Sequence, residues 1–298
     1  MYLPGTCGEL VQGIMRGRHF LISCPIDLYA RVTVDLFANG GRVVAPPEFP
    51  KAESALRMAL AHLNLRDVVA RLRIDSPIPR SKGMGSSTAD VAGAIYALAQ
   101  AVGRAITPAE VARLAIAVEP TNGSLFPNLA VFDHRQGSIY DDLGPAPPAA
   151  ILVLDCGGEV DTLSYNAVDR TALLVRLSPL AERALALTRE GIRRGDLEEV
   201  GEGATLSALA HQAVLPKAPL AKAVALGKEL GGLGVCVGHS GTVIGVFFPP
   251  ERHGDLDVAD RFRAALPTVA MVGWHRLVDG GCYSSPLGAP AVAELIRP

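Results

Sequence analysis

Several features that would place this chain in a specialised class are scarce or missing. Charged residues make up only 19% of its 298 residues and the formal net charge is −2, so it lacks the excess of Lys and Arg that binds a phosphate backbone. No apolar run approaches the roughly 20 residues that cross a bilayer. The N-terminus, MYLPGTCGEL, lacks the basic start and apolar stretch of a secretion signal. We expect no nucleic-acid partner, no membrane association and a cytoplasmic location.

Cysteine is also sparse. The five cysteines are odd in number and widely separated, and none forms a C-x-x-C pair: Cys7, Cys24, Cys156, Cys236 and Cys282. This spacing gives no support for a disulfide framework, a zinc site or a redox couple. We interpret them as small buried hydrophobic residues, of which Cys7 and Cys24 lie close to candidate site segments.

Apolar residues are plentiful, at 49% of the chain, which is typical of a compact enzyme with one large or two medium domains. Period-2 and period-3.6 patterns predict strands at 19–24, 29–36, 69–74, 150–154, 234–237, 243–248 and 268–272, and helices at 53–63, from 86–90 to 102, 107–119, 180–194, 197–212 and 220–230. This mixture predicts an α+β fold. The Pro- and Gly-rich segment at 141–148 predicts a boundary between domains at 1–148 and 149–298.

The segment Pro79–Asp90, PRSKGMGSSTAD, has the composition of a phosphate-binding loop. It precedes a predicted helix, whose first N–H groups have no partner within the helix and carry a partial positive charge. Gly83 and Gly85 would allow close approach of a phosphate, and the three hydroxyl residues that follow could hold phosphate oxygens or Mg²⁺. A polyphosphate ligand accounts for the whole segment.

Other nucleotide-binding patterns do not fit. A Walker A loop needs Gly-Lys followed by Ser or Thr, whereas Gly227-Lys228 is followed by Glu229. A dinucleotide fingerprint would need Gly where Thr88 stands, and the protein-kinase triads are missing, since His134-Arg135 is followed by Gln136. An ordinary capped helix would explain Ser86 but not the whole segment.

Three motifs in order along the chain resemble those of the GHMP kinases. The segment Pro79-x-x-x-Gly-Met-Gly-Ser-Ser-Thr-Ala89 is similar to the family's central motif, Pro, three residues, then Gly-Leu-Gly-Ser-Ser-Ala. Pro4–Glu9 near the N-terminus and Gly234–Thr242 near the C-terminus match the flanking motifs. The resemblance implies a two-domain GHMP kinase fold, with an N-terminal βαβ-type nucleotide-binding domain and a C-terminal ferredoxin-like α/β sandwich. It also implies ATP and Mg²⁺ as cofactors.

Within that family, five segments resemble the branch that phosphorylates the hydroxyl of L-threonine for cobalamin synthesis. They are Pro4–Gly13, Ser23–Asp27, Glu119–Thr121, Phe132–Arg135 and His239–Thr242. The resemblance implies ATP and an amino acid alcohol as partners, and leaves a homodimer open. Two alternatives remain: a kinase of this family for another small alcohol, such as homoserine or an isoprenoid precursor, and a nucleotide-binding protein of this fold without kinase activity.

The resemblance also assigns roles to individual residues. The nucleotide would contact Pro79, Lys82, Gly83, Met84, Gly85, Ser86, Ser87 and Thr88. Magnesium would be held by Ser87 and Glu119, and the substrate would contact Glu9, Asp27, Ser240, Gly241 and Thr242. Plainer alternatives remain: Glu119 could be a solvated carboxylate at a helix end, Asp27 and Glu9 could be turn caps, and 240–242 could be a simple hairpin.

The general base is the least determined part of this interpretation. Many members of the family carry an Asp shortly after the segment that begins at Glu119, and this chain has Asn122, which cannot accept a proton. We expect Asn122 to orient the substrate hydroxyl while magnesium, loop amides and a cation stabilise the transition state. Lys82 and Arg135 are the candidate cations and Asp133 the remaining candidate base, although Lys82 could be a solvated loop lysine and Asp133 part of a local ion pair.

Overall fold

The computed structural model describes residues 1–160 and 167–285. Within these ranges ten strands form one sheet, in the order β10-β7-β9-β8-β1-β2-β4-β3, with β5 paired to β2 and β6 paired to β5. The strands are β1 Tyr2–Met15, β2 Arg18–Ala38, β3 Arg42–Val44, β4 Val68–Asp75, β5 Leu129–Phe132, β6 Tyr140–Gly144, β7 Ala150–Asp155, β8 Gly234–Val237, β9 Val243–Phe248 and β10 Ala270–Arg276. The α-helices are α1 Pro50–His62, α2 Ser86–Ala101, α3 Pro108–Ile116, α5 Thr171–Arg194, α6 Leu197–His211, α7 Leu220–Glu229 and α8 Leu256–Ala265.

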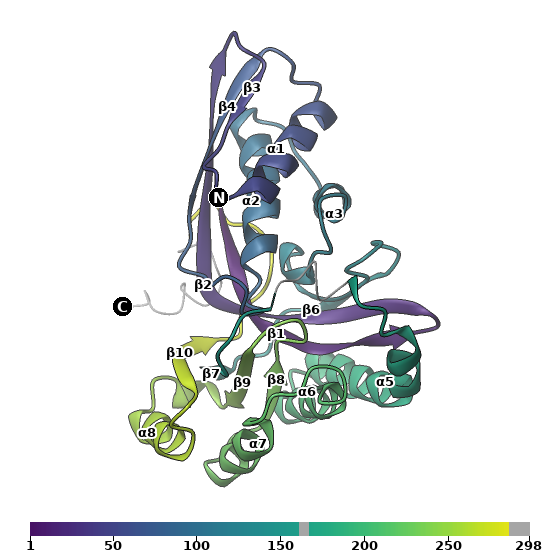
Figure 1. Cartoon of the computed structure of the whole chain (residues 1–298), viewed down its shortest axis with the longest axis vertical. Helices are drawn as coiled ribbons and strands as arrows, with labels where there is room; N and C mark the ends of the chain where they lie inside the picture. The colour runs from purple at the N-terminus through teal and green to yellow at the C-terminus, as the bar shows by residue number, and fades with distance from the viewer. Residues whose placement is uncertain (161–166, 286–298) are drawn as a thin grey trace.

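A long antiparallel hairpin of β1 and β2 runs through both halves of the molecule (Figure 1). Its turn places Arg16 and Gly17 at positive φ, 52° and 74°, as tight hairpin turns with the right-handed strand twist require. The pairing shifts register between Pro4 and Gly5, between Thr6 and Glu9, and again after Glu9. These irregularities lie in the first predicted motif and bend the strand beside the phosphate loop.

The upper half of Figure 1 packs α1, α2 and α3 beside β1, β2 and β4. Helix α2 is apolar around most of its surface and lies close to the sheet: a Cβ added to Gly93 would stand 2.5 Å from Val32 Cγ2. Thr107 caps α3 in a complete capping box with Glu110, as the sequence predicts. The helix ends at Ile116, three residues before the predicted end.

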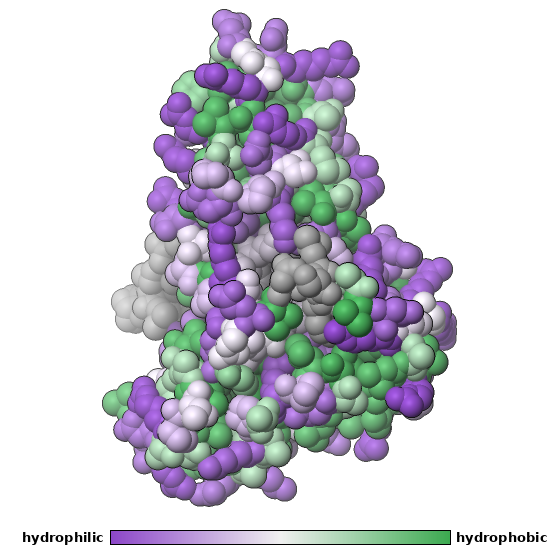
Figure 2. Space-filling view, viewed as in Figure 1, coloured by the Kyte–Doolittle hydropathy of each residue, from purple (hydrophilic) through white to green (hydrophobic). Residues whose placement is uncertain are grey.

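In the lower half, β7, β9, β8 and β10 extend the sheet, and α5 to α8 lie below it in Figure 1. In Figure 2, apolar side chains gather at the lower right, where α5 and α6 lie. Val175 and Leu180 on α5 and Leu209 on α6 are exposed. Among the described residues, no helix is long and apolar enough to cross a membrane.

The two halves meet where β1 and β8 pair at a single register position, Glu9 opposite Val237. The backbone N–H groups of Thr6 and Gly8 donate to the carbonyls of Met84 and Gly83 at 2.8 and 3.1 Å. The N-terminal motif, Pro4–Glu9, therefore contacts both the phosphate loop and the C-terminal motif, Gly234–Thr242. Because β7 continues the same sheet beyond residue 148, a domain boundary there stays a prediction.

Candidate active site

A cavity of about 290 Å³ opens at this junction. Its walls come from the start of α1, the loop and first turn of α2, the segment Glu119–Asn122 and the bent part of β1. Of the predicted site residues, it brings together Glu9, Asn122, Glu119, Ser240 and the loop residues Gly83–Thr88.

The phosphate loop ends in an uncapped helix N-terminus. Gly83 and Gly85 have φ of 77° and 73°, a region that residues with a Cβ adopt with difficulty, and Gly85 is the N-cap residue of α2 without a side-chain cap. Because the carbonyls of Gly83 and Met84 are bonded to β1, the loop is fixed in place. The α2 amides are thus available to an anion in the cavity.

The glycine-rich turn after β8 packs directly on this loop. A Cβ added to Gly241 would lie 2.3 Å from Lys82 O and 2.4 Å from Gly83 Cα, distances that only a shift of backbone could relieve. Thr242 N also donates to Lys82 O at 2.9 Å. Gly241 and Thr242 therefore support the loop from behind, while Ser240 lines the cavity.

We predict that Gly241→Ala weakens ATP binding by about 10-fold or more and destabilises the fold by about 1–3 kcal/mol, because the added methyl forces the loop away from its position. ATP titration and urea denaturation of the same samples would measure both effects. Gly40→Ala is the control: its Cβ would meet only the side chain of Val69, far from the cavity, so it should leave ATP affinity unchanged. Unchanged ATP affinity in Gly241→Ala would contradict this support role.

Ser87, Glu119 and Lys51 form a linked group at the phosphate end of the cavity. Ser87 Oγ donates to Glu119 Oε1, and Lys51 Nζ lies 2.6 Å from Glu119 Oε2. The Glu119 side chain is only 3% exposed. A lysine in the first turn of α1, a helix with no N-terminal side-chain cap, is electrostatically unfavourable there, so its position is explained by Glu119.

This group fits a magnesium ion. It offers a hydroxyl and a carboxylate, the hard oxygen ligands that Mg²⁺ prefers, and a cation, the Lys51 ammonium, already lies on the carboxylate. Within the described ranges no cluster of three or more His, Cys, Asp or Glu side chains could hold a metal by itself. Such an ion would therefore share its coordination with phosphate and water, as is usual for Mg²⁺ in kinases.

Thr88 and Asn122 tie α2 to the segment after Glu119. The Thr88 hydroxyl accepts from Thr121 Oγ1 at 3.0 Å and from Asn122 N at 3.2 Å. Asn122 Oδ1 accepts from the backbone and side chain of Ser124, and its Nδ2 lies next to the phosphate loop, 3.0 Å from where a Cβ on Gly85 would stand. The Asn122 amide is thus positioned to donate beside the loop.

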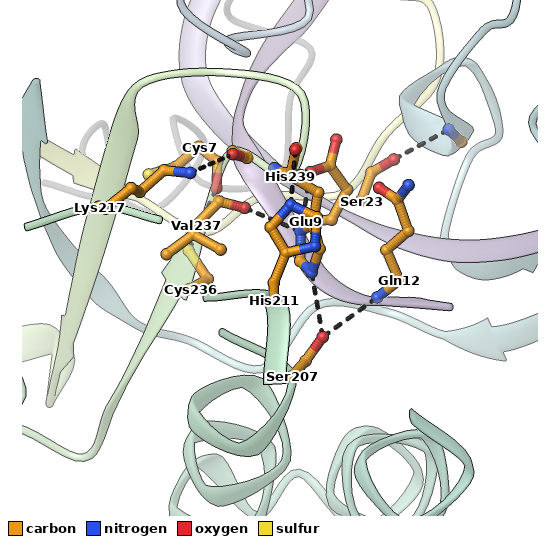
Figure 3. Close-up of polar contacts among 12 residues, drawn as sticks. Cys7, Glu9, Gln12, Ser23, Ser207, His211, Lys217, Cys236, Val237 and His239 are labelled. Carbon is orange, nitrogen blue, oxygen red and sulfur yellow. Dashed lines mark hydrogen bonds and ion pairs between the residues drawn. The ribbon is translucent and has the colours of Figure 1, made fainter. Parts of the chain in front are cut away.

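Glu9 also lines the cavity and is nearly buried. Its Oε2 accepts from His239 N at 2.8 Å and lies 3.2 Å from His239 Nδ1 (Figure 3). Burial raises the pKa of Glu9 to about 7, against opposing effects of the His239 N–H and of Lys217. The carboxylate therefore lacks a full cationic partner and would gain from an ammonium group in the cavity.

Buried polar groups hold His239 in position behind Glu9. Figure 3 shows its ring between Glu9 and Ser207, whose Oγ lies 3.1 Å from His239 Nε2 and accepts from Gln12 N. His211 Nε2 lies 2.7 Å from His239 O, and Lys217 Nζ donates to Gly238 O at 2.8 Å. Burial lowers the pKa of His239 to about 3, so its ring is neutral.

Lys82 is engaged elsewhere. Its Nζ lies 2.9 Å from Asp155 Oδ2 and donates to Gly158 O at 2.7 Å, and it is not among the residues that line the cavity. Thr242 Oγ1 donates to the other oxygen of Asp155. Lys82 and Thr242 therefore link the loop to the end of β7, and Pro79 likewise lies outside the cavity lining.

Asp133 and Asp27 also lie outside the lining. Burial opposes ionisation of Asp133, but hydrogen bonds from Ser138 and from the N–H groups of the turn outweigh it and lower its pKa. For Asp27, hydrogen bonds from His275 and Arg276 N likewise outweigh burial and lower the pKa. Asp133 stabilises its own turn and Asp27 links β2 to β10, so the arrangement gives no support to Asp133 as a base.

The sequence interpretation gave no role to several charged or titratable residues that line the cavity, among them Lys51, Arg80, Asp90 and His134. Lys51 could have been noticed, since a lysine follows the Pro that starts a helix, where a cation is unfavourable. Asp90 was read only as part of the helix start. His134 lies against His19 and is buried, which lowers its pKa to about 3.

Comparisons with known proteins identify the family of this chain. The family model for the GHMP kinases N terminal domain matches residues 51–129, and the model for GHMP kinases C terminal matches residues 188–268. An L-threonine kinase of Salmonella typhimurium is 34% identical over 256 residues, which are 84% of this chain and 83% of that protein. Two solved structures share the fold: a mevalonate kinase from Methanococcus jannaschii, with TM-score 0.64 and 15% identity over 92% of this chain and 96% of that one, and a homoserine kinase from Cytophaga hutchinsonii, with TM-score 0.64 and 13% identity over 94% of each.

The family models cover more than half of the chain, and they lie on either side of the predicted boundary. The α+β class predicted from the sequence patterns and the GHMP kinase fold implied by the motifs are both confirmed, because structural neighbours of the same family match nearly the whole chain. This chain belongs to the GHMP kinases.

Proposed function

We propose that this enzyme transfers the γ-phosphoryl group of ATP to the side-chain hydroxyl of L-threonine, giving L-threonine O-3-phosphate and ADP for cobalamin synthesis. The observation that carries the proposal is one cavity that is lined both by a phosphate-binding helix end and by Glu9, a buried carboxylate without a full cationic partner. The similarity to an L-threonine kinase over most of the chain supports it.

The phosphate end would bind the nucleotide through backbone. The α2 amides after Gly85 would contact the β- and γ-phosphates, and Ser87 and Glu119 would hold Mg²⁺. A bound Mg²⁺ would neutralise charge on the phosphate oxygens. Lys51 would then be displaced from Glu119 and free to contact the phosphates as the cation that the transition state needs.

The substrate end would bind the amino acid. Glu9 would accept hydrogen bonds from the ammonium group, and the Asn122 amide would orient the hydroxyl towards the phosphate loop. The hydroxyl oxygen forms a bond to the γ-phosphorus while the bond to the β–γ bridging oxygen breaks, and the hydroxyl proton passes to solvent water. With Asp133 engaged in its own turn, positioning and charge neutralisation would supply the catalysis.

The Glu9 carboxylate also favours one class of substrate over another. An ammonium partner for this carboxylate favours an amino acid, threonine or homoserine, over an isoprenoid alcohol, which has no cationic group. A cytoplasmic location and a homodimer stay predictions.

The test is incubation with ATP·Mg and a panel of alcohols: L-threonine, L-homoserine, L-serine and mevalonate. We expect ADP release with threonine at a kcat/KM at least about 10-fold above the others, since single-group differences in a fitted pocket change transition-state binding by that much or more. Phosphorus NMR of the product would locate the new phosphate ester. No ADP release with threonine would contradict the proposal. ADP release with homoserine alone would show that homoserine, and not threonine, is the substrate. Nucleotide binding without phosphoryl transfer to any of the alcohols would support the alternative of a nucleotide-binding protein of this fold without kinase activity.

A further inference from the structure

A buried chain of polar groups leads from α6 to the Glu9 carboxylate. Ser207 on α6 and His239 are 2% and 1% exposed, and neither lines the cavity. Neither is therefore placed to touch a ligand there, and the proposed chemistry gives them no role. Buried side chains that orient a ligand-binding group from behind commonly decide how well that group binds.

The contacts of Ser207 indicate which nitrogen of the His239 ring carries the proton. Gln12 N can only donate, so the Ser207 hydroxyl oxygen accepts from it at 3.2 Å. The hydroxyl proton is then available to His239 Nε2, which lies 3.1 Å from Ser207 Oγ (Figure 3). A ring nitrogen that accepts this proton carries none of its own, so Nε2 is the unprotonated nitrogen.

The other ring nitrogen of His239 faces two acceptors. Nδ1 lies 3.2 Å from Glu9 Oε2 and 3.1 Å from the carbonyl oxygen of Val237. A lone pair on Nδ1 would repel both oxygens, so Nδ1 holds the proton and donates. Burial lowers the pKa of His239 to about 3, so the ring is neutral and has one proton, which the contacts on both of its sides assign to Nδ1.

The donors to Glu9 reach only one of its two oxygens. His239 N donates to Oε2 at 2.8 Å, and Nδ1 is the second donor to the same atom. Within the described ranges no donor reaches Oε1, and Glu9 lines the cavity. One oxygen is therefore held by His239, while the other is left for a ligand.

We propose that His239 is a positioning residue for amino acid binding: its Nδ1–H holds Glu9 Oε2 and leaves Oε1 to the substrate ammonium. The proposal rests on the proposed function, which supplies the ammonium as the ligand of Glu9. With the proton on Nε2 instead, the lone pair of Nδ1 would repel the carboxylate and turn it away. Because Ser207 lies on α6, the helices below the sheet contribute to substrate recognition through His239 (Figure 1).

Nitrogen NMR of the full chain tests the tautomer without any substrate. The protonated and unprotonated nitrogens of a neutral imidazole differ widely in chemical shift, so the two tautomers can be distinguished. The chain has seven histidines, and the signals missing from a His239 variant identify those of His239. We expect a protonated Nδ1 and an unprotonated Nε2 in the wild type. A protonated Nε2 would overturn the inference.

Two substitutions separate positioning from a structural role. In His239→Asn the side-chain amide can place its N–H where Nδ1 lies, whereas in His239→Gln the longer side chain places it near Nε2. Both remove a buried ring, so thermal unfolding should show that both are destabilised. The KM for threonine should rise about 10-fold in His239→Gln and stay within about 3-fold of the wild type in His239→Asn. The kcat should be nearly unchanged in both, because the His239 side chain contacts Glu9 and not the phosphate loop.

His253→Gln is the control, since His253 lies in the turn before α8 and outside the cavity lining, and it should keep the wild-type KM and kcat. An equal rise in KM in both His239 variants, or an unchanged KM in His239→Gln, would overturn the inference and leave the proposed function standing. The wild-type tautomer and His239→Gln decide even if His239→Asn fails to fold. If the wild type phosphorylated no amino acid, the proposed function would fall, and this inference with it.

Discussion

Glu119→Gln is expected to reduce kcat for threonine phosphorylation by about 100-fold or more while leaving the fold intact. Glutamine keeps one oxygen, which can accept from Lys51, and its amide N–H can donate to the Ser87 hydroxyl, so little stability should be lost. It removes the negative charge that would hold Mg²⁺, and removing one group that stabilises transition-state charge costs about 10²–10³-fold in rate. Steady-state kinetics over a range of Mg²⁺ concentrations would show a lower kcat and a higher Mg²⁺ requirement.

A double-mutant cycle with Lys51→Gln separates two roles of the lysine. If Lys51 only neutralises Glu119, the double variant should be as active as Glu119→Gln alone. If Lys51 also contacts the phosphates, as proposed, the two losses should multiply. Glu53→Gln, which removes a charge on α1 outside the cavity lining, is the control and should have wild-type kinetics. A Glu119→Gln enzyme with wild-type kcat would rule out Glu119 as a magnesium ligand.

The elements that the sequence predicts well are those specified locally. The end of β4, the loop and α2 follow from alternation, glycine and an apolar helical pattern, and α3 from the Thr107 capping box. Strand β1 was not predicted, because Pro4 and Gly5 are typical of a turn and the strand accommodates them through shifts in register. Helix α8 was missed although Asp255 caps it, since its apolar face is short.

The residues of the candidate site fall into the same two groups, those that local motifs predict and those whose roles depend on distant parts of the chain. Ser87, Glu119 and Glu9 were found through motifs, and the structure brings all three to one cavity. The contacts of Lys82 and Asp27 depend on partners far along the chain, Asp155 and His275, which no local pattern reveals. A charged residue near a motif cannot be given a role before its tertiary partner is known, and this is why Lys51, which meets Glu119 across 68 residues, was missed.

Glu9→Gln is expected to stabilise the fold at alkaline pH while weakening threonine binding. In the folded chain the pKa of Glu9 is raised from 4.5 to about 7, so between these values the folded state holds a proton that the unfolded state has lost. Stability attributable to protonated Glu9 is therefore fully present below pH 4.5 and is lost as the pH rises to 7. The shift corresponds to at most about 3 kcal/mol of free energy of unfolding above pH 7.

Glutamine keeps an acceptor for His239 N and carries no charge, so the variant should gain stability over the wild type at pH 8 and little at pH 4.5. Urea denaturation at both pH values would measure the difference, with Glu202→Gln, an exposed position on α6, as the control that shows none. The KM for threonine should rise about 10-fold or more, because the ammonium loses its charged partner. A stability change equal at both pH values would contradict the raised pKa, whereas an unchanged KM would remove Glu9 from the substrate site. Stability gained and threonine binding lost in one variant would mean that Glu9 is retained for its ligand and not for the fold.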